Sequence, residues 1–148
     1  MPKRCVRPLR MNSKKLIPMN GNRVALDTNQ AIAVLNNTGD AGQWIQSFVE
    51  VYLPVPVIGE LCFGALNSRR SKQNLEYVEQ LVKRCQILEV SVATAQIYAH
   101  VRLILKRKGK PIPENDLWIA SVCIEHDVPL ATSDGHFTAI EELRLIMR

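Results

Sequence analysis

Short apolar runs alternate along the chain with longer segments in which apolar residues recur every three or four positions. The short runs predict buried strands, and the longer spacing predicts helices that pack one face against them. The expected strands are residues 23–27, 51–53, 86–90, 128–134 and 143–147. The expected helices are residues 28–37, 41–50, 58–66 after a turn at Pro54 to Pro56, 71–85, 91–109, 114–127 and 135–144.

Strands separated by helices indicate a three-layer α/β/α domain with a mostly parallel central sheet. A strand that is covered on both faces reads as a continuous apolar run, as "VAL" does at residues 24–26. Such sheets bind ligands beyond the carboxyl ends of their strands. The polar stretches "LDTN" (26–29) and "TSDGHF" (132–137) both follow expected strands, so a site is expected there.

The positive charge of the chain is concentrated at its start. The formal net charge is +5, but residues 1–22 hold six Lys or Arg and no acid, which leaves −1 for residues 23–148. This basic tail could be an arm that contacts nucleic acid phosphates, or an extension outside the domain with Met19 as an alternative start. We expect residues 23–148 to form the folded domain, because residues 1–18 lack the apolar periodicity needed to dock on a core.

Composition and motifs disfavour several classes of protein. No stretch approaches the roughly 20 apolar residues of a membrane span, and no apolar segment of a secretory signal follows the basic start. The four cysteines stand far apart, which indicates reduced thiols in a cytoplasmic protein. Neither a Gly-x-Gly-x-x-Gly nor a Walker motif is present. The three histidines are too scattered for a zinc site: His100 and His126 are expected on helix surfaces, and His136 lies near Asp134.

Four acids stand at or near the starts of expected helices: Asp27, Glu60, Asp116 and Asp134. Taken one at a time, Asp27, Asp116 and Asp134 are better explained by helix capping or helix-dipole effects than by a site. Glu60 has apolar or small neighbours one turn away on both sides, which predicts a partly buried carboxylate that needs a cation or a proton. Oxygen-only ligands favour Mg²⁺ or Mn²⁺. A metal site made of these four acids is therefore the alternative to four separate structural roles.

The order and spacing of the acidic motifs resemble those of a known protein family. "LDTN", the Glu of "GEL", "NDLWIA" and "LATSDGHF" resemble the four acidic motifs of the PIN-domain family, in particular the VapC-type toxins of bacterial toxin–antitoxin pairs. The resemblance covers about residues 23–146 and leaves out the basic tail. Its most specific part is "NDLWIA" followed by "LATSDGHF".

The resemblance implies a small metal-dependent ribonuclease and assigns its residues. Asp27 and Asp116 are then the principal ligands of Mg²⁺ or Mn²⁺, and Glu60 and Asp134 complete the catalytic site. Asn29 and Thr132 match polar positions that support this quartet. Many relatives carry a further acid where this chain has His136, which leaves the number of bound metal ions open.

The resemblance also implies partners. The substrate would be transfer RNA or another structured RNA with an exposed single-stranded loop, a cognate antitoxin would cover the site, and the chain would work as a homodimer without a membrane. The basic stretch at residues 106–110 could guide RNA, or it could be a solvated helix end. Two other functions stay open: a PIN-fold nuclease of RNA processing without an antitoxin, and a module that binds RNA or a protein without cutting.

Overall fold

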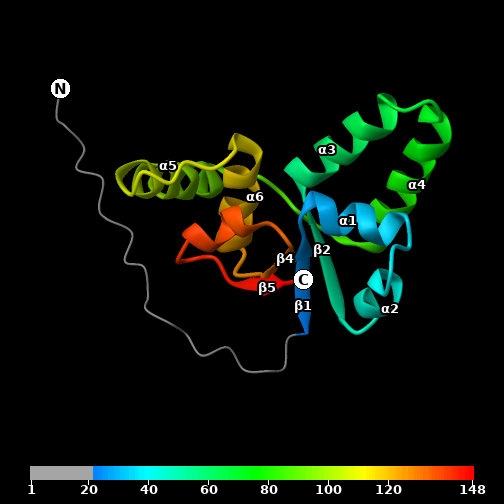
Figure 1. Ribbon diagram of the computed structural model, residues 1–148, viewed down its shortest axis with the longest axis horizontal. Helices are drawn as coiled ribbons and strands as arrows, with labels where there is room; N and C mark the ends of the chain where they lie inside the picture. The colour runs from blue at the N-terminus through cyan, green and yellow to red at the C-terminus, as the bar shows by residue number, and fades with distance from the viewer. Residues whose placement is uncertain (1–21) are drawn as a thin grey trace.

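The computed structural model describes residues 22–148, and in it five parallel strands form one sheet between two groups of helices (Figure 1). The strands are β1 (Arg23–Leu26), β2 (Glu50–Pro54), β3 (Gln86–Leu88), β4 (Leu130–Thr132) and β5 (Leu145–Met147). The helices are α1 (Thr28–Leu35), α2 (Ala41–Ile45), α3 (Val55–Leu66), α4 (Ser71–Arg84), α5 (Val92–Arg107), α6 (Glu114–Glu125) and the 3-10 helix η1 (Gly135–Ala139). The predicted three-layer α/β/α fold with a parallel sheet is confirmed.

The order of the strands reverses at the centre of the sheet. The order is β3-β2-β1-β4-β5, so the chain starts in the middle, adds β2 and β3 on one side and then returns to add β4 and β5 on the other. In Figure 1, α1 to α4 lie to the right of the sheet and α5 and α6 to the left. The connection thus reverses between β1 and β4, and ligands of open parallel sheets bind outside the carboxyl ends at such a reversal.

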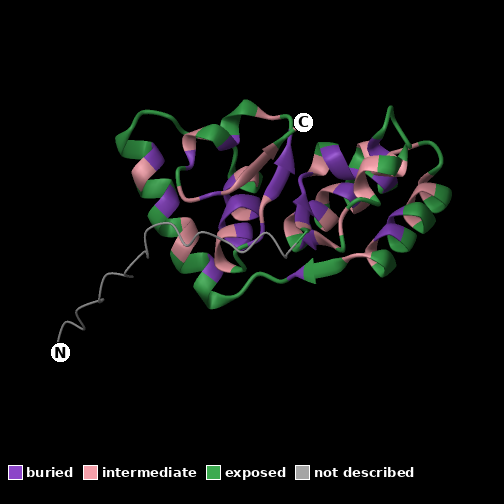
Figure 2. Ribbon diagram, turned by 90° about the horizontal axis from the view of Figure 1, so that it is seen from below, coloured by how far each residue is buried: buried purple, intermediate pink, exposed green. Residues whose placement is uncertain are grey.

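Burial follows the same arrangement. Val24, Ala25 and Leu26 of β1 are completely buried, as are Leu130 and Ala131 of β4, because both strands have neighbours in the sheet and helices on their faces. Figure 2 shows the buried residues in these central strands and on the inward sides of the helices, and the exposed residues on the outward sides. The continuous apolar runs of the sequence therefore mark the central strands of the sheet. None of the helices within residues 22–148 is both long and apolar enough to cross a membrane.

The predicted second helix was too long. The helix expected over residues 41–50 has only 5 residues, as α2. The Ser47 hydroxyl donates to the Trp44 carbonyl at 2.6 Å, and the main-chain N–H of Val49 donates to the Asn22 carbonyl at 2.9 Å. The chain is therefore drawn into the sheet before the helix can continue. Of the predicted basic tail, residues 1–22, only Asn22 lies within the described residues.

The turn predicted at Pro54 to Pro56 was wrong. Pro54 ends β2 and is also the N-cap of α3, and Pro56 lies in the first turn of that helix. The first N–H groups of a helix have no partner within it, so a residue without an N–H is tolerated there. As a result, β2 passes straight into α3 and sends the helix out from the carboxyl end of the sheet.

The predicted last helix was also wrong in type and length. Residues 135–144 form the short 3-10 helix η1 followed by a turn. The buried residues Phe137, Ile140 and Leu143 are three apart, and this spacing fits one face of a 3-10 turn as well as one face of an α-helix. The predicted terminal strand is confirmed as β5, which pairs in parallel with β4.

Candidate metal centre

Four elements bring the predicted acids to the carboxyl end of the sheet. Asp27 directly follows β1 and is the N-cap of α1, and Asp134 follows β4 and is the N-cap of η1. Glu60 lies in the second turn of α3, which starts where β2 ends. Asp116 lies in the first turn of α6. The sheet topology alone places the first two side by side, because β1 and β4 are neighbours.

Asp27 is both a helix cap and a member of this cluster. Its side chain is almost fully buried, with 3% of the residue exposed. One carboxylate oxygen accepts a hydrogen bond from the main-chain N–H of Gln30 at 2.7 Å, and the other accepts from the Thr132 hydroxyl. Burial raises the pKa of Asp27 above its ordinary value, although these two hydrogen bonds oppose the rise. The negative charges of Asp134 and Glu60 raise it further.

Thr132 connects two of the acids. Its side chain is completely buried at the end of β4. The hydroxyl donates to Asp27 and accepts a hydrogen bond from the main-chain N–H of Asp134 at 2.9 Å. The last residue of β4 therefore fixes the carboxylate that follows β1 and the backbone of the loop that carries Asp134. This is the position that the sequence assigned to a supporting polar residue.

Glu60 is held by two neutral side chains that the sequence did not single out. The Thr28 hydroxyl donates to one of its carboxylate oxygens, and the Asn115 amide donates to the other at 3.0 Å. Glu60 is half-buried, as predicted, but it is not left without partners. Thr28 and Asn115 each stand next to a predicted ligand, Asp27 and Asp116, and that adjacency is the signal that could have identified them.

Asp116, Asp134 and His136 form the open side of the cluster. Each offers one ligand atom, and these three atoms lie within 4.8 Å of one another. The His136 imidazole Nδ1 is 3.2 Å from a carboxylate oxygen of Asp134 and 3.7 Å from one of Asp116. Burial raises the pKa of Asp116, whose side chain is 19% exposed. The charges of Asp134 and Glu60 add to that rise, while His136 opposes it.

The remaining predicted residues lie outside this network. Asn29 is exposed in the first turn of α1, and its side chain makes no hydrogen bond to the described part of the chain, so its supporting role stays a prediction. His100 and His126 are exposed on or at the end of helices, as expected.

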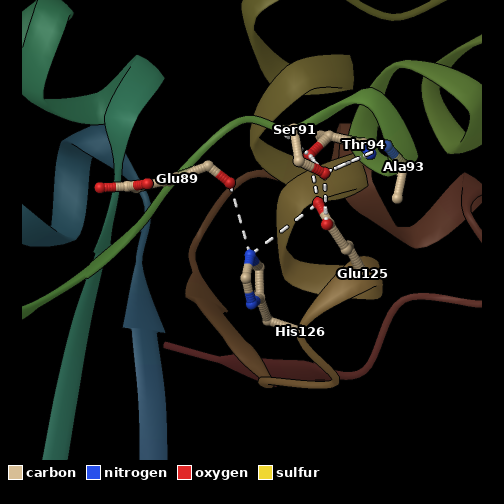
Figure 3. A network of polar contacts seen from close by, with 6 residues as sticks. All are labelled: Glu89, Ser91, Ala93, Thr94, Glu125 and His126. Atoms are coloured by element: carbon tan, nitrogen blue, oxygen red, sulfur yellow. Dashed lines mark hydrogen bonds and ion pairs between the residues drawn. The ribbon is translucent and has the colours of Figure 1, made fainter.

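His126 belongs to a different polar network, which joins the start of α5 to the end of α6 (Figure 3). The N-cap Ser91 accepts hydrogen bonds from the N–H groups of Ala93 and Thr94, and the Ser91 N–H donates to the Thr94 hydroxyl at 2.8 Å. Both hydroxyls also donate to Glu125, and the His126 Nε2 lies 3.8 Å from that carboxylate. These contacts account for Glu125 and His126 as structural residues.

The donor set of the cluster fits a divalent cation. None of the four acids pairs with a Lys or Arg of residues 22–148, and the only basic group against them is the His136 imidazole. The pKa values of Asp27 and Asp116 are both raised by burial and by neighbouring negative charges. A bound cation would remove that penalty, and carboxylate oxygens are the ligands that hard divalent cations prefer.

Comparison with known proteins identifies the class of this fold and site. The PIN domain model matches residues 24–143, and the chain therefore belongs to the PIN-domain family. Ribonuclease VapC2 of Rickettsia felis is 27% identical over 113 residues, which are 74% of this chain and 84% of that protein. Toxin FitB of Neisseria gonorrhoeae is 32% identical over 107 residues, 66% of this chain and 77% of that toxin.

A solved structure supports the same assignment. The crystal structure of VapBC2 from Rickettsia felis bound to a DNA fragment from their promoter contains a chain that superimposes with a TM-score of 0.80 at 26% identity. The alignment covers 85% of this chain and 98% of that one. The predicted resemblance to the PIN-domain family, with VapC-type proteins among the relatives, is confirmed.

Proposed function

We propose that this protein is an endoribonuclease that depends on Mg²⁺ or Mn²⁺ and acts as the toxin of a toxin–antitoxin pair. The observation that carries the proposal is the convergence of Asp27, Glu60, Asp116 and Asp134 from four elements, with no Lys or Arg of the described residues to neutralise them. The relatives named ribonuclease VapC and toxin FitB support the reaction and the biological role.

The protein prepares this centre through hydrogen bonds to its carboxylates. Gln30 and Thr132 hold both oxygens of Asp27, and Thr28 and Asn115 hold those of Glu60, so the acids need little rearrangement. When bound, Mg²⁺ or Mn²⁺ would neutralise charge on the scissile phosphodiester and lower the pKa of the attacking water. A carboxylate of the quartet would serve as the general base for that water.

The substrate of the proposed reaction is a single-stranded segment of a structured RNA. Bases in loops are unstacked, and a strand there reaches an open acidic site more readily than a duplex does. The four basic residues within positions 106–110 are all exposed, and Lys108 forms an ion pair with Glu141 at 2.5 Å. Lys106, Arg107 and Lys110 remain as the cations proposed to contact RNA phosphates.

The biochemical test is RNA cleavage by the purified protein. We expect loop-containing RNA, such as total transfer RNA, to be cut in the presence of Mg²⁺ or Mn²⁺ and to stay intact when EDTA is added. Product size on a denaturing gel separates internal cuts from trimming of the ends. Cleavage that continues in EDTA would contradict the metal dependence, and intact RNA in both metals would favour a module that binds without cutting.

The proposed antitoxin has a surface to occupy beside the acidic cluster. A groove of about 370 Å³ runs between α1, α3 and α4, and both apolar and polar residues line it, Glu60 among them. The apolar residues are Ile32, Leu35, Leu61, Ala65 and Val78. Because Glu60 belongs to both the groove and the cluster, a protein segment seated in the groove would also block the site.

Expression of the protein alone in a bacterial host is expected to slow growth, and co-expression of its antitoxin is expected to restore it. The physical reason is cleavage of essential RNA by a site that nothing covers. Growth curves check this, with an Asp116→Asn variant at equal soluble level as the matched control. Normal growth with the parental protein would count against the toxin role. If the purified protein nevertheless cleaves RNA, a nuclease of RNA processing would be favoured.

The domain proposed for residues 23–148 predicts that the N-terminal tail is dispensable for catalysis. A chain that begins at Met19 is expected to keep the melting temperature of the full chain and to cleave RNA within about twofold of its rate. The acidic cluster and the buried residues of the described range 22–148 all lie beyond the deleted segment. Thermal unfolding and RNA cleavage of the two chains check this. A large loss of either would place residues 1–18 in the functional domain.

A further inference from the structure

The His136 imidazole lies beside the carboxylates of Asp116 and Asp134. Its Nδ1 lies 3.2 Å from a carboxylate oxygen of Asp134 and 3.7 Å from a carboxylate oxygen of Asp116. Two ligands at right angles around an ion, each about 2.1 Å from it, lie about 3 Å apart, and opposite ligands lie about 4.2 Å apart. The three ligand atoms, all within 4.8 Å of one another, are therefore spaced so that one ion can contact them with small side-chain movements.

The backbone around His136 is fixed although its ring is accessible. Its main-chain N–H donates to the Asp134 carboxylate at 2.9 Å, so the two potential ligands are tied together. The next residue, Phe137, is only 1% exposed and anchors η1 in the core. The His136 side chain itself is 56% exposed, and its ring nitrogens have no partner among the described residues other than Asp116 and Asp134. The imidazole can thus reach a cation that enters from solvent.

These contacts allow two roles with opposite consequences. As a protonated counter-charge, His136 would compete with a cation, and its removal would raise the affinity of the site for divalent ions. As a neutral ligand, it would supply a lone pair, and its removal would lower that affinity. The spacing of the three ligand atoms and the accessible ring favour the second role.

We infer that His136 is a nitrogen ligand of the cation in this centre and that it shifts the preference of the site from Mg²⁺ towards Mn²⁺. Mg²⁺ binds oxygen ligands and keeps several of its waters, whereas imidazole is a good ligand for first-row transition ions. The inference rests on the proposed function, since it assumes that the acidic cluster holds a metal ion. It adds a ligand and a metal preference to that proposal.

The test measures metal binding directly. Electron spin-echo envelope modulation of Mn²⁺ bound to the full chain should show coupling to a directly bound ¹⁴N, and isothermal titration should give the Kd for Mn²⁺ and for Mg²⁺. Loss of an outer-shell partner alone costs about 10–100-fold in metal affinity, so His136→Ala should weaken Mn²⁺ binding at least about tenfold. The effect on Mg²⁺ should be smaller. The ¹⁴N coupling should disappear.

Two further variants sharpen the result. His136→Asp replaces the nitrogen by an oxygen, so it should lose the ¹⁴N coupling, keep metal binding and move the ratio of the two Kd values towards Mg²⁺. The control is His126→Ala, which removes another exposed histidine that lies 3.8 Å from a carboxylate (Figure 3). It should keep both the coupling and the affinities of the parent protein.

Each contrary outcome has a defined meaning. Unchanged or tighter Mn²⁺ binding by His136→Ala, or ¹⁴N coupling that persists in it, overturns the inference. Asp116→Asn, measured alongside, separates this from failure of the proposed function. If Asp116→Asn loses Mn²⁺ binding while His136→Ala keeps it, only the nitrogen ligand is wrong. If the parent protein binds no Mn²⁺, or Asp116→Asn binds it as tightly as the parent does, the proposed metal centre falls together with the inference.

Discussion

Replacing Asp116 with asparagine is expected to lower metal-dependent RNA cleavage at least about 100-fold, because a direct ligand should cost no less than the 10–100-fold typical of an outer-shell partner. The metal-free protein should stay folded and become more stable. Burial and the charges of Asp134 and Glu60 raise the pKa of Asp116, so its ionised form is unfavourable in the folded state at neutral pH. The neutral amide removes that repulsion.

The same pKa shift predicts how stability depends on pH. The pKa of Asp116 is raised above its ordinary value of 3.8, so over the range between that value and the folded pKa the folded state binds more protons than the unfolded state. The free energy of unfolding of the metal-free protein should therefore fall as the pH rises through this range. Asp116→Asn should reduce this dependence, and saturating Mn²⁺ should weaken it by favouring the ionised form. Thermal unfolding in EDTA and in Mn²⁺ at several pH values checks both.

A neighbouring acid supplies the matched control. Glu114 lies on the same first turn of α6, but its exposed side chain pairs with Arg102 at 3.3 Å and accepts from Tyr98. Glu114→Gln changes the charge of the helix start by the same amount without touching the cluster. It is expected to cleave RNA within about twofold of the parent rate. Parental cleavage by Asp116→Asn in the same metal would remove Asp116 from the proposed site.

Asp27 is expected to respond differently to asparagine and to alanine. Asparagine caps helices about as well as aspartate, so Asp27→Asn should keep the hydrogen bond from the Gln30 N–H. Its amide nitrogen cannot accept from the Thr132 hydroxyl, but its neutral side chain also removes the repulsion from Asp134 and Glu60, so metal-free stability should change little. Alanine removes the cap and leaves the Gln30 N–H and the Thr132 hydroxyl without an acceptor, which should cost about 1–3 kcal/mol. Both variants should lose cleavage at least about 100-fold, because each lacks the charged ligand.

Urea unfolding in EDTA and RNA cleavage in Mn²⁺ distinguish the two roles of Asp27. The control is Asp127→Asn, which removes an exposed acid that pairs with Arg144 at 3.1 Å, outside the cluster. It should leave cleavage unchanged. An Asp27→Asn variant that cuts at the parental rate would show that the residue is only a cap. If Asp27→Asn loses activity together with a large part of its metal-free stability, Asp27 would likewise be assigned a structural role only.

The fold could be predicted because its central strands are short continuous apolar runs in the sequence. "VAL" in β1 and "LA" in β4 are completely buried, and strands that are covered on both faces are mostly apolar. The prediction of an α-helix at residues 135–144 was wrong because one apolar spacing fits two kinds of helix. Residues 135–144 repeat apolar side chains every third position, which suits a 3-10 turn and an α-helix alike.

The acidic residues of the site could be located because each follows a strand or lies near the start of a helix. Thr132 was also expected to support them, but the two side chains that hold Glu60 were not singled out. Thr28 and Asn115 reach Glu60 across 32 and 55 positions of sequence, so the contacts depend on how α1, α3 and α6 pack. The double hydrogen bond of Thr132 likewise depends on the pairing of β1 with β4, which no local pattern encodes.

The position of β4 beside β1 has a consequence for the synthesis of the protein. The first strand of the domain gains its neighbour on that side only after the chain has reached residue 130, and Asp134 and His136 follow later still. A nascent chain therefore lacks part of its proposed catalytic centre until nearly all of the domain has left the ribosome. Cleavage by the proposed nuclease is therefore not expected before β4 has paired with β1.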